Sequence, residues 1–191
     1  MTSPRVINDA LHAELAQRWL MPRAPDAHKG DFGPMLLIGG DAGYSGAILL
    51  AAETALRAGA GATMVACAEL TAATLWLHRP ELMALAVKQR ADLMPALSKA
   101  RTVVVGPGLG LGAWAHMLWP TLEQAGTVQV LDADGLTWLA QNPQPHRARI
   151  LTPHPGEAAR LLQCSVAEVQ QDRLAAVHRL QARYGGVVIL K

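Results

Sequence analysis

Short apolar runs alternate with longer amphipathic stretches from residue 35 onward, and this alternation predicts strands separated by helices. Strands are predicted at residues 35–38, 62–66, 82–87, 102–105, 128–131, 148–151 and 187–190. Helices are predicted at residues 10–20, 45–58, 113–125, from 155 onward, and from a capping box at 165 to 184. Alternating strands and helices with apolar strands predict a mainly parallel sheet covered on both faces, a three-layer α/β/α domain.

Composition narrows the class of protein. The 191 residues suffice for one domain, and a chain with 51% hydrophobic and only 4% aromatic residues builds its core from Ala, Leu and Val. The net charge is +2 and no basic run occurs, so the chain gives little support to nucleic-acid binding. Residues 1–27, a helix and a proline-marked linker, are predicted to precede a domain at 28–191.

Cysteine usage and the lack of targeting segments indicate a cytoplasmic protein. Cys67 and Cys164 lie far apart, outside any Cys-x-x-Cys spacing, and are predicted to be reduced and buried. The N-terminus lacks the apolar stretch of a secretory signal. The longest apolar region, residues 46–70, is interrupted by three charged residues, so we expect no membrane span.

Two glycine-rich loops follow predicted strands and precede helices. The first, GGDAGYSGA at 39–47, lets a ligand approach the backbone, and small Gly46 and Ala47 leave space in the crevice. We favour this interpretation over a loop whose glycines serve only geometry, because open α/β sheets bind ligands at this edge. The second, GPGLGLGA at 106–113, matches a dinucleotide fingerprint from Gly108, with Asp132 ending the next strand. This second pattern is weak by itself.

The segment TPHPGE at 152–157 joins a strand to a helix and is the most informative stretch of the chain. Pro155 suits the first helical position and Glu157 suits the helix dipole, so both have structural roles. His154 can hydrogen-bond a sugar hydroxyl or an amide, or it can cap the helix, and the sequence leaves these two roles equally open.

Two further acids and the histidines are weaker candidates. Asp132 and Asp134 could orient a hydroxyl, bind magnesium through water, or cap the following helix, and capping is the commoner role. The histidines are scattered without the spacing of a metal site, so no protein metal site is predicted.

Together these segments resemble the ADP- or ATP-dependent NAD(P)H-hydrate dehydratases of the ribokinase-like superfamily. The segments that carry the resemblance are HKGDFG at 28–33, GGDAGYSGA at 39–47, RPELM at 79–83, VGPGLG at 105–110, LDAD at 131–134, LTPHPGE at 151–157 and VILK at 188–191. They occur in family order and cover nearly the whole chain. The pair of segments at 152–157 and 106–110 is the most specific.

The resemblance implies a metabolite-repair lyase that restores NAD(P)H from NADHX or NADPHX, the cofactors hydrated at C6 of the nicotinamide ring. It implies that Ala47, Gly108 and His154 contact the hydrated cofactor and that Lys191 begins the nucleotide-binding segment. ADP or ATP with Mg²⁺ would be the cofactors. Members of the family are often homotetramers, so the complete protein is expected to be one.

The resemblance also places a glycine-rich turn ending in Gly-Asp, with the catalytic base, after Lys191. We therefore expect the fold to be incomplete at its C-terminal end and the 191-residue chain to be inactive alone, with no catalytic residue among its own. The N-terminal epimerase domain that often accompanies this family has no counterpart in residues 1–27.

Three alternatives remain at the level of sequence. A ribokinase-like kinase of the hydroxymethylpyrimidine or hydroxyethylthiazole type would share the architecture with a different acceptor hydroxyl. A non-catalytic nucleotide-binding module would also fit. A Rossmann dehydrogenase would bind intact NAD at the Gly108 loop.

Overall fold

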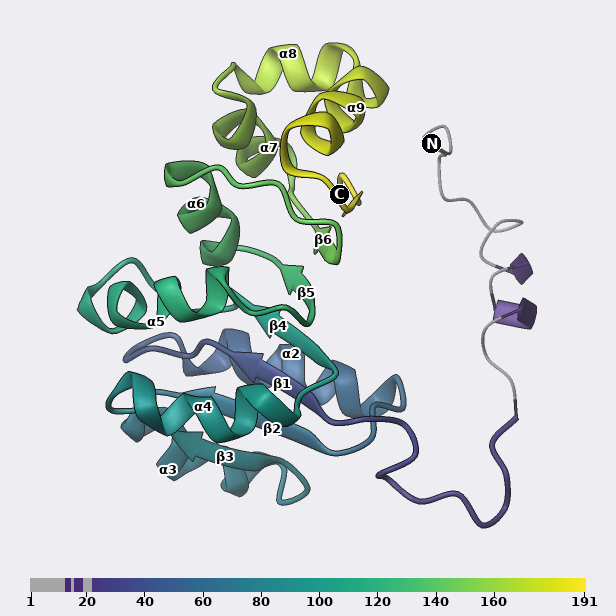
Figure 1. Cartoon of the computed structure of the whole chain (residues 1–191), viewed down its shortest axis with the longest axis vertical. Coiled ribbons are helices and arrows are strands. Elements are labelled where there is room, and N and C mark those ends of the chain that lie inside the picture. The colour runs from purple at the N-terminus through teal and green to yellow at the C-terminus, as the bar shows by residue number, and fades with distance from the viewer. Residues whose placement is uncertain (1–12, 15, 19–21) are drawn as a thin grey trace.

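A computed structural model describes residues 13–14, 16–18 and 22–191 (Figure 1). The predicted helix at 10–20 lies largely outside the described residues, although 13–14 and 16–18 are helical. The division at residue 27 stays a prediction. The strands are β1 (Met35–Ile38), β2 (Thr63–Cys67), β3 (Met83–Ala86), β4 (Thr102–Val105), β5 (Val128–Leu131), β6 (Arg149–Leu151) and β7 (Val187–Val188).

Helices connect the strands. They are α2 (Ser45–Arg57), α3 (Glu69–His78), α4 (Arg90–Lys99), α5 (Ala113–Glu123), α6 (Asp134–Gln141), α7 (Pro155–Leu162), α8 (Val166–Gln171) and α9 (Arg173–Tyr184). None of the described helices is long and apolar enough to cross a membrane.

The seven strands of the described residues form one parallel sheet in the order β3-β2-β1-β4-β5-β6-β7. The α/β fold class is confirmed, and every described pairing is parallel. The strand order reverses between β1 and β4, because the chain first builds outward from β1 to β3 and then returns to add β4. Loops that follow strands on either side of such a reversal diverge and leave a crevice at the carboxyl edge of the sheet.

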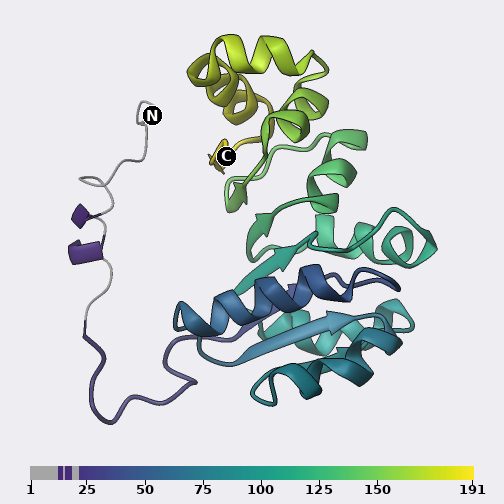
Figure 2. The same cartoon turned by 180° about the vertical axis from the view of Figure 1, so that it is seen from behind.

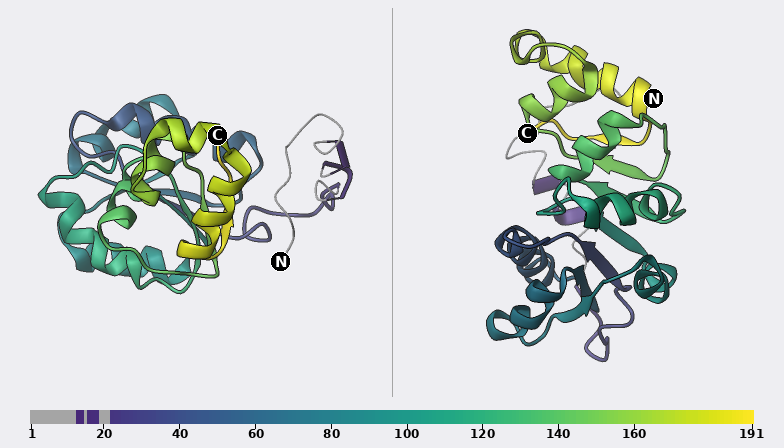
Figure 3. Two further views of the ribbon diagram at one scale, coloured as in Figure 1. Left: turned by 90° about the horizontal axis from the view of Figure 1, so that it is seen from above. Right: turned by 90° about the vertical axis from the view of Figure 1, so that its left-hand side faces the viewer.

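Two buried clusters lie on opposite faces of the sheet. One joins Leu37 and Val65 to α2 and α3. The other joins Leu36 and Val103 to α4 and to the later helices. In Figure 1 the helices α4 and α5 lie in front of the sheet, and in Figure 2 α2 and α3 do. Figure 3 shows this layering from the side, with helices on both sides of the strands.

The face that carries α2 and α3 is covered over only part of the sheet. Strand register places Val104, Val130, Ile150 and Val187 in one row with Leu37, so their side chains point to this face. Val130 and Ile150 are partly exposed and belong to neither buried cluster, and Val187 is 56% exposed. Within the described part of the chain no helix covers the part of this row from Val130 to Val187, and β5 and β6 are seen directly in Figure 2.

The C-terminal region corrects one prediction. The single helix expected from the capping box at Ser165 to Tyr184 is two helices. Asp172 interrupts it, and its carboxylate accepts a hydrogen bond from the N–H of Ala175 at 2.9 Å. Asp competes for backbone N–H groups in this way, so it begins a new helix and does not continue the old one. The capping box at Ser165 and Glu168 is confirmed.

Candidate functional site

The candidate site lies at the carboxyl edge of the sheet, where the neighbouring strands β1 and β4 end. Their loops are joined by two backbone hydrogen bonds, from Gly40 N–H to Pro107 O at 3.1 Å and from Asp41 N–H to Gly108 O at 2.7 Å. The glycine loops that the sequence singled out separately are therefore one unit. Such a unit at the strand reversal is where open α/β sheets bind ligands.

Gly108 and Ala47 are neighbours where these two loops meet. Gly108 has φ +63°, and a Cβ added to it would lie 3.3 Å from Cβ of Ala47 and 2.6 Å from the carbonyl oxygen of Tyr44. Only glycine fits, because the conformation is left-handed and the backbone of the other loop leaves no space. The structure thus brings together two of the three residues predicted to contact the substrate.

The loop after β4 is also fixed from its other side. The carboxylate of Asp134 accepts a hydrogen bond from Gly110 N–H at 2.8 Å, and the indole of Trp138 donates to Gly110 O at 3.0 Å. Asp134 is the first residue of α6, and neither it nor Asp132 caps that helix with its side chain. The preferred sequence interpretation, that these acids cap the helix, is therefore wrong. Asp134 holds a neighbouring loop, and Asp132 pairs with a lysine.

His154 lies two strands from Gly108, at the end of β6, and it does cap its helix. Its Nδ1 accepts from Gly156 N–H at 3.0 Å, and its own N–H donates to the carboxylate of Glu157 at 2.7 Å. The side chain remains 57% exposed, so the capping role leaves most of the ring accessible at the sheet edge. One of the two roles left open is now observed, and the other stays a prediction.

Lys191 reaches the same edge from the end of β7. Its Nζ lies 2.6 Å from Oδ1 of Asp132 and 4.0 Å from Oε2 of Glu157. Its backbone N–H donates to Pro153 O at 2.9 Å, which fixes the last described residue beside the His154 loop. Glu157 is only 7% exposed, so its carboxylate contributes a largely buried negative charge that sequence reasoning had assigned only to the helix dipole. Its position three residues after His154, the spacing of a capping box, was the available signal.

Strain marks the loop between the two acids. Ala133 has φ +49° and ψ −119°, a conformation that non-glycine residues adopt only at a cost of about 1–3 kcal/mol. This turn directs Asp132 toward Lys191 and Asp134 toward Gly110. Strain of this kind is concentrated at functional sites.

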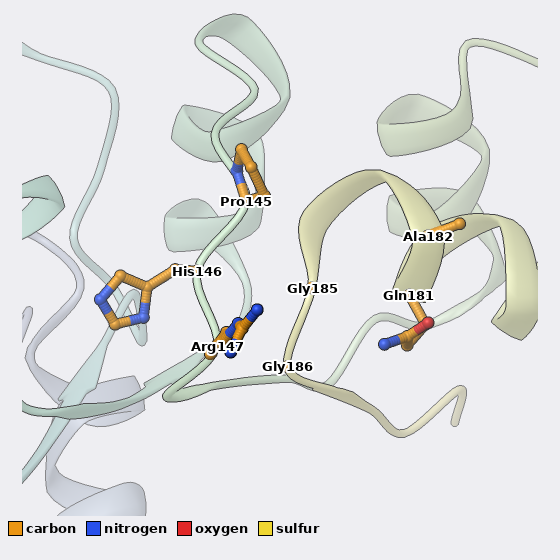
Figure 4. Close-up of a pocket in the computed structure, with 7 residues that line it drawn as sticks. All are labelled: Pro145, His146, Arg147, Gln181, Ala182, Gly185 and Gly186. Atoms are coloured by element: carbon orange, nitrogen blue, oxygen red, sulfur yellow. The ribbon is translucent and has the colours of Figure 1, made fainter. Parts of the chain in front are cut away.

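Two hollows lie away from this edge. One of about 380 Å³ opens at the amino ends of β6 and β7, where the ring of His146 points away from the two glycines (Figure 4). It is lined by Pro145, His146, Arg147, Gln181, Ala182, Gly185 and Gly186. A smaller one, of about 200 Å³, lies beside the ion pair of Glu53 and Arg79. Neither includes a predicted site residue.

Comparison with known proteins decides the family. The family model described as NAD(P)H-hydrate dehydratase matches residues 35–191. The chain belongs to the NAD(P)H-hydrate dehydratase family. The matched residues include every segment at the carboxyl edge described above. The match does not favour the kinase or dehydrogenase alternatives.

Relatives are found among both bifunctional and single-function proteins. The chain is 48% identical over 179 residues to the bifunctional NAD(P)H-hydrate repair enzyme of Escherichia coli, across 94% of this chain and 35% of that protein. It is 40% identical to the ADP-dependent (S)-NAD(P)H-hydrate dehydratase of Neisseria meningitidis, across 88% of this chain and 59% of that one. The chain therefore spans about a third of the first relative and three fifths of the second.

Solved structures agree on the dehydratase fold. A hypothetical protein of Streptococcus mutans superimposes with a TM-score of 0.86 at 31% identity, over 98% of this chain and 68% of that one. The ADP/ATP-dependent NAD(P)H-hydrate dehydratase of Bacillus subtilis, co-crystallised with ATP/Mg²⁺, gives 0.78 at 28% identity, over 93% and 64%. The ribokinase-like architecture predicted from the sequence is confirmed.

Proposed function

We propose that this protein acts in the ADP-dependent dehydration of hydrated NADH or NADPH, which restores the reduced cofactor. The observation that carries the proposal is the convergence of the two glycine loops at the strand reversal, with Ala47 and Gly108 in contact range. His154 and Lys191 lie along the same sheet edge. Names of relatives in the family support the reaction and the nucleotide.

The chemistry explains why a nucleotide is consumed. Hydroxide is a poor leaving group, so direct loss of the C6 hydroxyl is slow. Transfer of the terminal phosphoryl group of ADP to that oxygen leaves AMP and gives a phosphate ester. Cleavage of the C6–O bond then expels phosphate, the ring nitrogen donates its electron pair, and loss of the C5 proton restores the dihydropyridine.

The residues divide between the two ligands. Ala47, Gly108 and His154 contact the hydrated cofactor, where backbone close to the ligand and an exposed imidazole provide van der Waals contact and hydrogen bonds. Lys191 contacts the phosphates of the adenine nucleotide, since its ammonium lies at the sheet edge and is 44% exposed.

Magnesium fits this edge as part of a nucleotide complex. The described residues contain no group of three or more His, Cys, Asp or Glu side chains that could hold a metal ion by themselves. Mg²⁺ is commonly held by one or two carboxylates together with substrate phosphates. Asp132 and Glu157, both near Lys191 Nζ, supply carboxylates of this kind. The ion would neutralise phosphate charge during transfer.

Calorimetry and absorbance test the function together. The 191-residue chain is titrated with hydrated NADPH and with ADP/Mg²⁺, and absorbance at the reduced-nicotinamide band is followed in the mixture. We expect binding of hydrated NADPH that is weakened by His154→Ala, with Gly126→Ala as a control that changes no contact. A folded chain that binds no hydrated cofactor, or that phosphorylates a thiamine precursor instead, would overturn the proposal.

Two earlier expectations have tests of their own. Recovery of absorbance by the 191-residue chain would contradict its expected inactivity while establishing the dehydration. The tetramer is expected of the complete protein, and light scattering of that protein tests it by measuring the mass in solution. A cytoplasmic location stays a prediction, and fractionation of cells with an antibody against the chain tests it.

A further inference from the structure

Tyr44 is an exposed aromatic residue at the strand reversal. It lies in the loop between β1 and α2, and 58% of it is exposed. Its backbone is nevertheless fixed, because its N–H donates to Asp41 O at 2.9 Å and its carbonyl accepts from Ala47 N–H at 3.2 Å. A fixed backbone therefore presents a large, partly apolar ring to solvent, where a ligand at the strand reversal can reach it.

The surroundings of Tyr44 are open on two sides. A Cβ added to Gly43 or to Gly46 would meet no atom within 4 Å. Gly46 lies in the first turn of α2, where glycine in place of alanine costs about 1 kcal/mol, and no positive φ or close contact requires it. The absence of side chains at these two positions leaves the space beside Tyr44 free for a ligand.

Tyr44 also touches the predicted substrate residues. Its Cβ would lie 2.9 Å, and its carbonyl oxygen 2.6 Å, from a Cβ on Gly108. In the described part of the chain its hydroxyl makes no hydrogen bond and its ring packs against no other aromatic or arginine side chain. The ring thus extends from a backbone that packs against Ala47 and Gly108, and in the described residues it makes no polar or aromatic contact of its own.

We propose that Tyr44 is the surface on which a flat ring of the dinucleotide stacks, and that it sets the affinity for that ligand. This proposal rests on the proposed function of the same site. An aromatic face recognises the π-face of a heterocycle without hydrogen bonds, and stacking of this kind tolerates several ring types. The adenine ring offers such a face, and so does the planar N1–C2=C3–carboxamide part of the hydrated nicotinamide ring, whose C4, C5 and C6 are tetrahedral.

Two substitutions distinguish the contribution of the aromatic face of Tyr44 from those of its apolar bulk and its hydroxyl group. Tyr44→Phe keeps the aromatic face, and Tyr44→Leu keeps apolar bulk without it. Leu77→Ala, at the C-terminal end of α3 and therefore at the opposite edge of the sheet, is the control for loss of a surface apolar side chain. Thermal unfolding of each variant reports whether the fold is retained.

We expect Tyr44→Phe and Leu77→Ala to bind hydrated NADPH like the unsubstituted chain, and Tyr44→Leu to bind about tenfold more weakly. Stacking also lowers the near-ultraviolet absorbance of the bound ring, and this change is expected in the Phe variant and absent in the Leu variant. Unchanged affinity in Tyr44→Leu, or equal loss in Tyr44→Phe, overturns stacking.

Ligand fragments identify the ring. Hydrated nicotinamide mononucleotide lacks adenine, and ADP-ribose lacks nicotinamide, so a loss in Tyr44→Leu confined to one fragment assigns the stacked ring and supports the proposal. If the folded, unsubstituted chain binds neither hydrated NADPH nor either fragment, the proposed function fails. Binding by the unsubstituted chain with no effect of Tyr44→Leu removes the role of Tyr44 alone.

Discussion

Asp132 and Lys191 form an ion pair that joins the end of β5 to the last residue of the chain, with 2.6 Å between Oδ1 and Nζ. The two residues are 59 positions apart in sequence. They come together because only one strand, β6, separates β5 from β7 in the sheet. Both side chains remain more than a third exposed, so the pair contributes little to stability, about 0–1 kcal/mol. Its consequence is the placement of a cation and a carboxylate where the nucleotide is proposed to bind.

Asp132→Asn should change nucleotide binding in opposite directions with and without metal. Without Mg²⁺ the amide no longer neutralises Lys191, so ADP should bind more tightly, by up to about fivefold. With Mg²⁺ the loss of a carboxylate should weaken ADP binding. Calorimetry with EDTA and with excess Mg²⁺ measures both, and Asp134→Asn, which leaves the lysine pair intact, is the control. Weaker binding in EDTA would contradict the argument.

Gly108→Ala should destabilise the fold by about 1–3 kcal/mol and reduce binding of the hydrated cofactor. The new methyl group would occupy a left-handed position and press against the backbone of Tyr44. Gly126→Ala is the matched control, because Gly126 has open space and no positive φ, and its expected change is below about 0.5 kcal/mol. Urea unfolding compares the two variants, and equal stabilities would show that the loops are not packed as described.

Three strands were predictable to the residue because their apolar runs are short and are followed by glycine or aspartate. The predicted strands at 35–38, 102–105 and 128–131 agree with the structure at both ends. Of the predicted strand at 187–190, only Val187 and Val188 pair with β6. Buried strands of parallel sheets read as continuous apolar runs, so the signal is local.

Two helices escaped prediction for physical reasons. In α3 the buried positions are Thr71 and Leu75, whereas Leu70, Trp76 and Leu77 are exposed, so the helix lacks an apolar stripe of period 3.6. In α4 an internal proline, Pro95, contradicts the helical pattern. Only packing against the sheet overrides these local signals.

The sequence predicted which loops form the site but not which side chains contact one another there. Glycine-rich strand ends identified which loops meet, because parallel strands end at one edge. The partners of Asp132, Asp134 and Glu157 depend on strand order, which local pattern does not contain. Likewise Cys164 is only half-buried, although burial was predicted for both cysteines, because its turn after α7 lies near the surface.

Val65→Ala should cost more stability than Val130→Ala, although both side chains point to the same face of the sheet. Val65 is fully buried under α2 and α3, so its loss should cost roughly 2 kcal/mol or more. Val130 lies in the part of this face that no described helix covers and is already partly exposed, so its replacement should cost about half as much or less. Denaturant unfolding measures both values. A Val130 cost equal to that of Val65 would mean that another element covers this face in solution.

Cys67 should resist thiol reagents in the folded protein, whereas Cys164 should react. Cys67 is fully buried at the end of β2, and burial raises the pKa of its thiol to about 12. Only the thiolate reacts, so at pH 8 about one molecule in ten thousand carries the reactive form, and the reagent has no access to it. Labelling should therefore give one modified cysteine in buffer and two in denaturant.

The variant Cys164→Ser isolates the buried thiol. Its labelling rate should follow the free energy of unfolding, increasing with urea along the unfolding curve, because the reagent reaches Cys67 only when the chain opens. Raising the pH from 7 to 9 should increase the rate at least as steeply as it does for a free thiol, because the reaction occurs on opened chains, in which burial no longer raises the pKa of Cys67. Labelling in buffer at the rate of a free thiol would place Cys67 at the surface and contradict the packing of β2 beneath α3.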